Sequence, residues 1–371
     1  MEQTKKNILI VSRSFYPMNS PRSFRTTELA KEFARQGHQV KVITPREDGV
    51  HDEFEKEFGI TIKDMGWPKS KEIEIKGTLP EKFIRRGIKR FSDLLFLYPK
   101  MQYKNLVNNA LKGEEGYDLL VSIAVPYPVH FGVAKIRSKE YPIAKTWVAD
   151  CGDPFMGAEN DSFKYPFYFK YWEKWFCRKA DYLSVPTTGS IQAYYPEFHD
   201  KIKVIPQGFK FEEFPHQNGK PSNARPRFAY AGALIPGRRD PSEFLDYLVN
   251  LDADFEFHIY TSQTQMIKPY LKSGGDRIKL NSTIPRNELL HELTNMDFLV
   301  NFENVGSKQT PSKLIEYAVL GKPILSVKYG NLKPETIDRF LKGNYEDSFQ
   351  VENLEQYRID NVCRQFLDLA D

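Results

Sequence analysis

Asn7-Ile-Leu-Ile-Val-Ser12, followed by Ser20-Pro21 and then by Gln39-Val-Lys-Val-Ile-Thr44, decides the fold of this chain. The first stretch is a short apolar run, which is typical of a parallel strand buried on both faces. Ser20 is a good helix N-cap and Pro21 suits the first helical turn, so we expect a helix between the two apolar runs. Strand, helix and strand in this order form a βαβ unit, which predicts a parallel sheet with right-handed crossovers.

The length of the chain and its later pattern predict a second domain. The chain has 371 residues, too many for one ordinary core. Further buried-strand patterns follow at residues 117–122 and 144–149, and a second strand–helix alternation starts at Phe228, after a polar segment at residues 215–226. We therefore expect an α/β protein with two Rossmann-like domains and a central cleft. The expected bounds are residues 1–205, residues 206–345, and a C-terminal helix over residues 346–371 that packs back towards the first domain.

Composition narrows the class of protein. Cys151, Cys177 and Cys363 are too few and too scattered for a disulfide framework or a cysteine metal site, and they favour a reducing compartment. No apolar run approaches the roughly 18 residues of a spanning helix, and the polar start is unlike a signal peptide. The net charge of +4 is too modest to indicate nucleic-acid binding. A cytoplasmic protein that binds no nucleic acid is expected.

The sharpest candidate site is the start of the helix expected after residue 309. Thr310 can cap that helix and Pro311 suits its first turn, so the free N–H groups there can bind an anion. Lys313 adds a positive charge for a phosphate. Glu316 shares a helix face with Ser312, and its carboxylate can accept two hydrogen bonds from a ribose diol. The pattern predicts a nucleotide diphosphate site, and a well-capped surface helix is the alternative.

A second candidate is the stretch Tyr230-Ala-Gly-Ala-Leu-Ile-Pro-Gly-Arg-Arg-Asp-Pro241. Gly232 directly follows an expected strand, where the backbone can approach a ligand closely. Arg238 and Arg239 follow in the loop, and the arginine side chain binds phosphate with two parallel hydrogen bonds. A solvated arginine pair is the alternative.

Together, several motifs resemble the bacterial family-4 glycosyltransferases of the GT-B fold, and the resemblance covers nearly all of the chain. It implies a retaining enzyme that needs no metal and no other cofactor, since the nucleotide-sugar is a co-substrate. It also implies a donor site with the diphosphate on Arg239 and Lys313 and the ribose on Glu316, completed by Gly232, Arg238, Thr310, Ser312 and Leu314. The motifs are Phe15-Tyr-Pro17, Ser20-Pro-Arg-Ser-Phe-Arg25, residues 30–44 with Gly37-His38, Val204-Ile-Pro-Gln-Gly208, residues 230–239, Pro311-Ser-Lys-Leu-Ile-Glu-Tyr317 and Leu320-Gly-Lys-Pro323.

The sequence departs from the family pattern at two places. The family often has a paired Glu motif, E-x7-E, and its first position is Lys308 here, which puts the usual sugar contacts in doubt. Many members also carry a His after the strand expected at residues 144–149, where this chain has Asp150-Cys-Gly-Asp153. We expect Asp153, or else Asp150, to be the catalytic carboxylate that faces the sugar, because negative charge stabilises an oxocarbenium-like transition state. A turn at Asp153-Pro154 is the alternative.

The helix expected at Ser20 begins straight after the first strand, so its start should face the ligand edge of the sheet. Ser20, Arg22 and Arg25 are therefore the candidates on the acceptor side, although the two arginines could instead meet the donor phosphate. A capped helix with solvated arginines is the alternative. His130 near the start of another helix is interpreted as structural.

Residues 81–104 combine many basic side chains with interleaved apolar ones. A basic amphipathic helix can lie on an anionic membrane surface, which would suit a lipid-linked acceptor and a peripheral location at the inner face of the cell membrane. The alternative is a helix that packs its apolar side on its own domain.

These expectations lead to a hexosyltransferase-type enzyme that moves a sugar from a UDP- or GDP-linked donor to a glycan or lipid-linked acceptor. Synthesis of a bacterial surface polysaccharide is the expected setting. A nucleotide-sugar epimerase on the same fold and a non-catalytic nucleotide-sugar-binding protein are the alternatives. A dinucleotide oxidoreductase is disfavoured because no G-x-G-x-x-G follows an expected strand.

Overall fold

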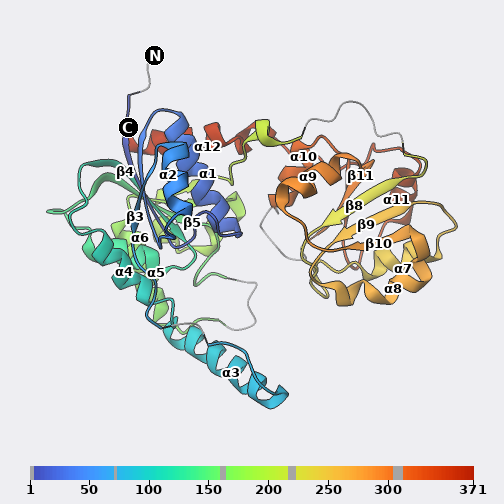
Figure 1. Cartoon of the computed structure of the whole chain (residues 1–371), viewed down its shortest axis with the longest axis horizontal. Helices are drawn as coiled ribbons and strands as arrows, with labels where there is room; N and C mark the ends of the chain where they lie inside the picture. The colour runs from blue at the N-terminus through green and yellow to red at the C-terminus, as the bar shows by residue number, and fades with distance from the viewer. Residues whose placement is uncertain (1–3, 71–72, 159–163, 216–222, 304–311) are drawn as a thin grey trace. The chain divides into compact units, whose positions relative to one another are not determined.

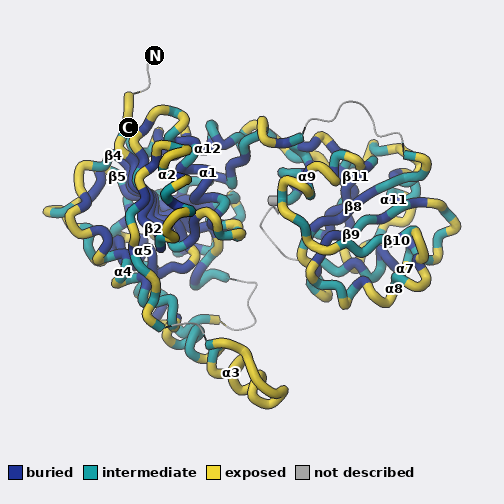
Figure 2. The backbone as a smooth tube through the Cα atoms, viewed as in Figure 1, coloured by how far each residue is buried: buried dark blue, intermediate teal, exposed yellow. Residues whose placement is uncertain are grey.

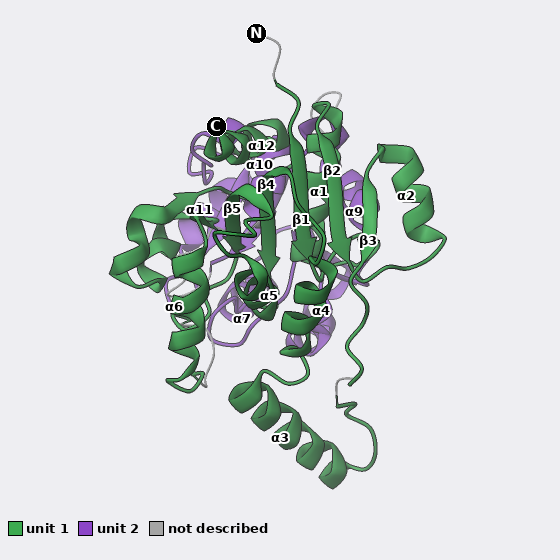
Figure 3. Cartoon of the chain, turned by 90° about the vertical axis from the view of Figure 1, so that its left-hand side faces the viewer, with its two compact units in different colours: residues 1–209, 356–371 green, residues 210–355 purple. Residues whose placement is uncertain are grey.

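The structure is a computed structural model that describes residues 4–70, 73–158, 164–215, 223–303 and 312–371, with the backbone alone at residue 312. It divides into two compact units (Figure 3). Unit 1 comprises residues 1–209 with 356–371, and unit 2 comprises residues 210–355. The sequence predicted domain boundaries between residues 205 and 206 and between residues 345 and 346, whereas the units divide after residues 209 and 355. Most of the polar segment at residues 215–226 lies outside the described residues.

Unit 1 is built on a seven-stranded sheet whose strands all run parallel (Figure 1). Ile8 pairs with Val40 on one side and with Leu119 on the other, so the expected βαβ unit is present. The strand order reverses direction between β1 and β4, which makes the carboxyl ends of these two strands a topological switch point, the usual ligand position in such sheets. The strands in sheet order are β3 (Thr61–Asp64), β2 (Gln39–Thr44), β1 (Asn7–Ser12), β4 (Tyr117–Ala124), β5 (Ala144–Cys151), β6 (Tyr182–Val185) and β7 (Ile202–Val204).

Helices cover both faces of this sheet. Phe33 of α1 and Phe366 of α12 pack with Ile10 in one core cluster, and Phe131 and Phe176 pack in the other. The first cluster involves α1 (Pro21–Arg35), α2 (Val50–Phe58) and α12 (Ile359–Leu367), and the second involves α4 (Gln102–Ala110), α5 (Pro128–Ile136) and α6 (Phe169–Lys179).

Residues 46–79 gave no assignment from sequence, yet they contain α2 and the edge strand β3. Each is short, and only Phe54 and His51 of α2 and Ile62 of β3 are buried, so the sequence pattern was weak there. The basic amphipathic stretch at residues 81–104 contains α3 (Leu79–Phe96) and the start of α4. In the part of the chain that the structure describes, no helix has the combination of length and hydrophobicity that a membrane span requires.

Unit 2 has a five-stranded parallel sheet, which also reverses direction at its first strand, between β8 and β11. Phe228 at its centre stacks on Phe257 and Phe298, with ring centroids 4.8 and 4.5 Å apart. The strands in sheet order are β10 (Ile278–Asn281), β9 (Glu256–Tyr260), β8 (Arg227–Ala231), β11 (Phe298–Phe302) and β12 (Ile324–Val327). The helices are α7 (Ser242–Asn250), α8 (Lys268–Gly274), α9 (Arg286–Thr294), α10 (Ser312–Val319) and α11 (Pro334–Leu341).

Candidate functional site

The switch point of unit 2 joins the two stretches that the sequence marked as donor-binding. The backbone N–H of Ala231, the last residue of β8, donates to the Tyr317 hydroxyl of α10 at 3.0 Å. Gly232 follows directly, and a Cβ there would come within 2.6 Å of the Tyr230 hydroxyl oxygen. That hydroxyl in turn donates to the Ala233 carbonyl at 2.8 Å. A glycine is therefore required by packing after β8, and Tyr317 fixes α10 beside it.

Three cationic side chains gather at this edge. Burial lowers the pKa of Lys313; Glu316 opposes this effect, and the positive charges of Arg239 and Arg286 lower the pKa further. Arg239 Nε is buried without a hydrogen-bond partner among the described residues. Partly buried cations that repel one another are stabilised by an anion placed between them. The cluster thus has the charge that a diphosphate would neutralise.

Glu316 forms an ion pair in the same place. Its Oε1 accepts from Arg286 Nε at 2.6 Å, and the Arg286 guanidinium lies over the Phe214 ring, 5.2 Å from its centroid. Arg286 is the first residue of α9, far from Glu316 in sequence, and no local pattern marked it. Sequence reasoning therefore missed Arg286. Its ion pair occupies one edge of the carboxylate, and the rest of the group can accept hydrogen bonds from a diol.

The other residues expected to bind the donor differ in how far the structure supports that role. Leu314 is buried in α10, so it supports the helix rather than lining an open site. The backbone N–H of Arg238 donates to the Ile235 carbonyl within the loop after β8. Ser312 begins α10, whereas Thr310 and Lys308 lie outside the described residues.

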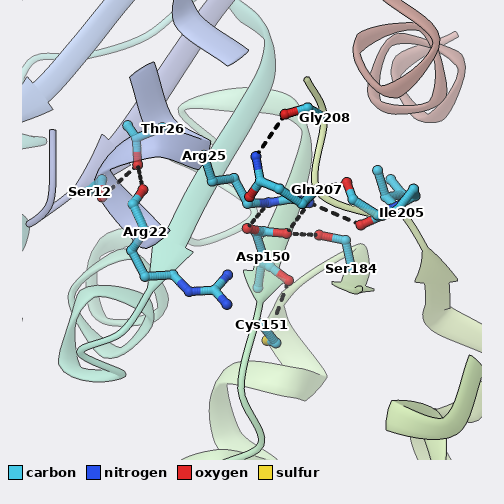
Figure 4. A network of polar contacts seen from close by, with 12 residues as sticks. Ser12, Arg22, Arg25, Thr26, Asp150, Cys151, Ser184, Ile205, Gln207 and Gly208 are labelled. Atoms are coloured by element: carbon cyan, nitrogen blue, oxygen red, sulfur yellow. Dashed lines mark hydrogen bonds and ion pairs between the residues drawn. The ribbon is translucent and has the colours of Figure 1, made fainter. Parts of the chain in front are cut away.

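In unit 1, Arg25 and Asp150 form a buried ion pair (Figure 4). Arg25 Nε donates to Asp150 Oδ2 at 2.6 Å and Nη2 donates to Oδ1 at 2.7 Å, while Ser184 Oγ donates to Oδ1 at 2.6 Å. Burial raises the pKa of Asp150, but Arg25, Arg22 and the Ser184 hydrogen bond outweigh it, so the pKa is lowered overall. Arg25 also donates to the carbonyls of Ile205 and Pro206. Both side chains are therefore turned into the protein, and they brace β5 against α1.

Arg22 and Asp153 remain at the open edge. Arg22 Nη2 lies 3.6 Å from Asp153 Oδ2, and the Asp153 side chain is 55% exposed. A Cβ on Gly152 would overlap the Arg22 guanidinium, so the glycine provides the room in which Arg22 lies. Of the two carboxylates expected to face a sugar, Asp153 is the one that solvent reaches.

A cavity of about 510 Å³ lies at the switch point of unit 1. Arg13 and Ser14 reach it from the end of β1, and Val125 and Pro126 reach it from the end of β4. Two of the expected acceptor-side residues, Ser20 and Arg22, also line the cavity. The remaining lining residues are Trp67, Pro68, Ser70, Pro99, Lys100 and Tyr103.

His130 lies in the core, as the sequence reading expected for a structural residue. Its Nδ1 is 2.8 Å from Ser122 Oγ and its Nε2 is 3.7 Å from Cys151 Sγ. Burial lowers the pKa of His130 to about 3, with Asp150 opposing, so the imidazole is neutral.

Cys151, Cys177 and Cys363 are all buried free thiols, so no disulfide forms, as expected. In the described ranges, no group of three or more His, Cys, Asp or Glu side chains is placed to hold a metal ion.

Comparison with known proteins gives a family and a fold. The sequence model of Glycosyltransferase Family 4 matches residues 24–213, just over half of the chain, whereas no curated protein matches significantly. A glycosyltransferase from Rickettsia africae ESF-5 is similar in structure, with 13% identity, a TM-score of 0.64, and coverage of 99% of this chain and 98% of that one.

Two further solved structures are similar over the whole chain. The lipopolysaccharide outer core galactosyltransferase WaaB in its apo form has 14% identity, a TM-score of 0.55 and coverage of 98% of both chains. The UDP-GlcNAc 2-epimerase from Methanocaldococcus jannaschii has 13% identity, a TM-score of 0.52 and coverage of 98% of this chain and 99% of that one. At such identities the likeness establishes the fold alone, and it confirms the expected two-domain GT-B architecture.

Proposed function

Because the chain belongs to Glycosyltransferase Family 4, we propose that it transfers a hexose from a UDP- or GDP-linked donor held by unit 2 to a glycan or lipid-linked acceptor held by unit 1. The observation that carries the donor half is the cluster of Arg239, Lys313 and Arg286 around Glu316 at the switch point of unit 2. Synthesis of a bacterial surface polysaccharide is the setting that we propose.

The donor is oriented by charge. Arg239 and Lys313 take the diphosphate, and Glu316, held by Arg286, takes the ribose hydroxyls. Arg286 positions the carboxylate and adds to the positive field. Gly232 keeps the end of β8 free of a side chain next to Arg239 and α10.

We propose transfer with retention of configuration and without a metal. The leaving diphosphate accepts the proton of the attacking acceptor hydroxyl as the donor C–O bond breaks and the new glycosidic bond forms. The arginine and lysine side chains neutralise the charge that develops on the diphosphate, which is the task a divalent cation performs elsewhere. Asp153 stabilises positive charge on the sugar ring from the acceptor side. Turnover is therefore expected to persist in EDTA.

A thermal-shift screen of nucleotide-sugars tests the donor site. One donor class should stabilise the chain, and Glu316→Ala and Arg239→Ala should each abolish that shift. Glu288→Ala and Lys272→Ala, at exposed positions of α9 and α8, are the matched controls and should keep it. If both site variants keep the full shift, the proposed donor site is wrong.

Product analysis separates this function from its alternatives. The stabilising donor is incubated with and without a panel of acceptors. Isomerised nucleotide-sugar in the absence of acceptor identifies an epimerase. Binding with no turnover on any acceptor identifies a nucleotide-sugar-binding protein.

We also propose that unit 1 contacts an anionic membrane through α3, which would place a cytoplasmic enzyme at the inner face of the cell membrane. None of the residues of α3 is buried; most are exposed, and those at residues 92–95 near its C-terminal end are intermediate (Figure 2). Phe83 is 80% exposed and Phe91 is 60% exposed. Such contiguous apolar exposure marks an interaction surface.

The two sides of α3 support a lipid surface in particular. Ile84, Ile88, Phe91 and Leu95 recur at spacings of four, three and four residues, so they share one face. The segment that packs against α3 lies on its other, basic side, where Ile73 and Ile75 line a cavity with Arg86, Lys89, Arg90 and Asp93. Ile84, Ile88 and Phe91 of this face are exposed, whereas Leu95 at its end is partly buried and its carbonyl accepts a hydrogen bond from the Tyr168 hydroxyl. The flanking cations complement anionic headgroups.

Vesicle sedimentation tests this contact. The chain should bind vesicles that contain phosphatidylglycerol and should bind phosphatidylcholine vesicles weakly. Phe83→Ser with Phe91→Ser should abolish the binding, whereas Phe349→Ser, an exposed phenylalanine of unit 2, should not. Unchanged sedimentation of the double variant overturns the proposal, and a double variant that instead turns from dimer to monomer assigns the face to a second copy of the chain.

A further inference from the structure

We propose that the cavity at the switch point of unit 1 takes an acceptor that carries a negatively charged group, a phosphate or a carboxylate, beside its reacting sugar. This inference rests on the proposed function for the identity of the reaction, and on the cavity for the charge of the acceptor. The cavity is large enough for about a disaccharide, since pockets of a few hundred Å³ hold small ligands.

The described lining contains three cationic side chains and no carboxylate, although two of these cations have a carboxylate partner outside the lining. The three cations are Arg13, Arg22 and Lys100. Arg13 makes no ion pair with the residues that the structure describes; its Nε donates to the Tyr103 hydroxyl at 3.3 Å. A neutral glycan would leave this charge uncompensated, whereas an anionic group would bind it with charge-assisted hydrogen bonds.

Two of the three cations are ion-paired with carboxylates that lie outside the described lining. Asp153 is 3.6 Å from Arg22, a separation longer than a hydrogen bond, and it is largely exposed. Asp93 of α3 forms an ion pair with Lys100, with 2.8 Å between Oδ1 and Nζ. The charge of Lys100 is therefore partly neutralised, whereas that of Arg13 is not. Arg13 is therefore the side chain on which the charge preference should depend most.

The rest of the lining is largely apolar and aromatic. It includes Trp67, Pro68 and Pro99 together with Val125 and Pro126. An indole ring presents a flat face to the C–H side of a sugar, and it also reports on its environment by fluorescence. A lining that combines cations with an aromatic ring and apolar side chains fits a sugar ring with an attached anion, rather than a free inorganic anion.

The basic lining continues beyond this cavity. A second cavity of about 340 Å³ shares Pro99 and Lys100 with the first and adds Arg86, Lys89 and Arg90 from the basic side of α3. Cations thus extend from Arg13 to α3. A chain of charged units, as in an acidic glycan, or a single phosphate near a lipid could follow this path, and both share the negatively charged group that the first cavity would hold.

Binding of matched glycosides to the full chain tests the inference. α-Glucose 1-phosphate and glucuronate serve as the charged probes, and methyl α-glucoside serves as the neutral one. Quenching of Trp67 fluorescence is measured against Trp67→Phe as a blank. The charged probes should bind about tenfold more tightly at low salt, and the preference should shrink as salt rises. If the phosphate probe binds more tightly than the carboxylate probe, a phosphate-linked acceptor is favoured. The reverse order of affinities favours an acidic sugar.

Arg13→Gln should remove the preference without weakening the neutral glycoside. Lys139→Gln lowers the net charge equally at an exposed position outside the cavity, and it should keep the preference. Equal binding of charged and neutral probes, or no quenching by any of them, overturns the inference. If a donor still stabilises the chain through Glu316 in that case, the proposed function survives; if no donor does, the proposed function fails on its own test.

Discussion

Arg25 and Asp150 are each other's partners, although one was expected to meet the acceptor and the other to face the sugar. The Arg25 guanidinium donates two hydrogen bonds of 2.6 and 2.7 Å to the Asp150 carboxylate, and both side chains are nearly inaccessible to solvent. The pair joins the first turns of α1 to the end of β5 (Figure 4). Arg22 and Asp153, each three residues from a member of the pair, lie at the open edge.

Asp150→Asn should destabilise the chain by about 3–5 kcal/mol, because it leaves the Arg25 charge buried and unpaired. Urea unfolding measures the loss. The pKa of Asp150 is lowered below its usual 3.8, so the ionic contribution is present above that pH and is lost as pH falls through the folded-state pKa. The exposed Asp153→Asn is the control and should change stability by less than about 1 kcal/mol. An Asp150→Asn variant as stable as the parent would show that the pair contributes nothing.

Gly152→Ala should weaken acceptor use while leaving the fold intact. The new Cβ overlaps the Arg22 guanidinium, which is the flexible end of a side chain and can move away. We expect a several-fold rise in the acceptor KM, little change in the donor thermal shift, and a stability loss within about 1 kcal/mol. Gly87→Ala, where a Cβ meets open space, is the matched glycine control in assays without lipid. An unchanged acceptor KM would remove Arg22 from the acceptor site.

Donor affinity should fall as pH rises towards 10.5. The pKa of Lys313 is lowered from 10.5 by burial and by neighbouring cations, and a bound diphosphate would raise it again. Binding is therefore strongest below the lowered pKa and weakens by about tenfold as the ammonium loses its proton above it. Titration of the donor dissociation constant against pH measures this. Lys313→Arg keeps its charge and should flatten the profile; a wild-type profile that is already flat contradicts the assignment.

Glu173 should make stability pH-dependent near neutrality. Its side chain is buried in α6, and one oxygen accepts from the Met156 N–H at 3.4 Å. Burial raises the pKa of Glu173 to about 7, with hydrogen bonds from Met156 and Tyr195 opposing. The protonated Glu173 therefore contributes to the free energy of unfolding, and this contribution is fully present below about pH 4.5. It is lost as pH rises through about 7, and the total loss is on the order of 3 kcal/mol.

Glu173→Gln keeps the hydrogen-bond acceptor without the charge, so its unfolding free energy should stay level between pH 5 and about 8 where that of the parent falls. Glu115→Gln, at an exposed position of unit 1, should follow the parent. Parallel pH profiles for the parent and Glu173→Gln would rule out ionisation of Glu173 as the cause.

Much of the site could be predicted because its elements are local. The N-cap Ser20, the glycine after β8 and the start of α10 each follow from a few neighbouring residues. Partners distant in sequence could not be predicted. Arg286 reaches Glu316 from another helix, and Asp150 looked like an open carboxylate until the fold placed Arg25 against it.

The sequence by itself predicted the two parallel sheets and a helix over the residues of α10, because apolar periodicity acts over a few residues. Thr310 and Pro311, the expected start of that helix, lie outside the described residues. Only the tertiary structure decided which charges are open and which are paired. Asp150 is enclosed whereas Asp153 is exposed, and Arg13 meets Arg22 and Lys100 around one cavity. The physical reason is that burial and ion pairing depend on which strands and helices become neighbours, and strand order in a sheet is not a local property of the chain.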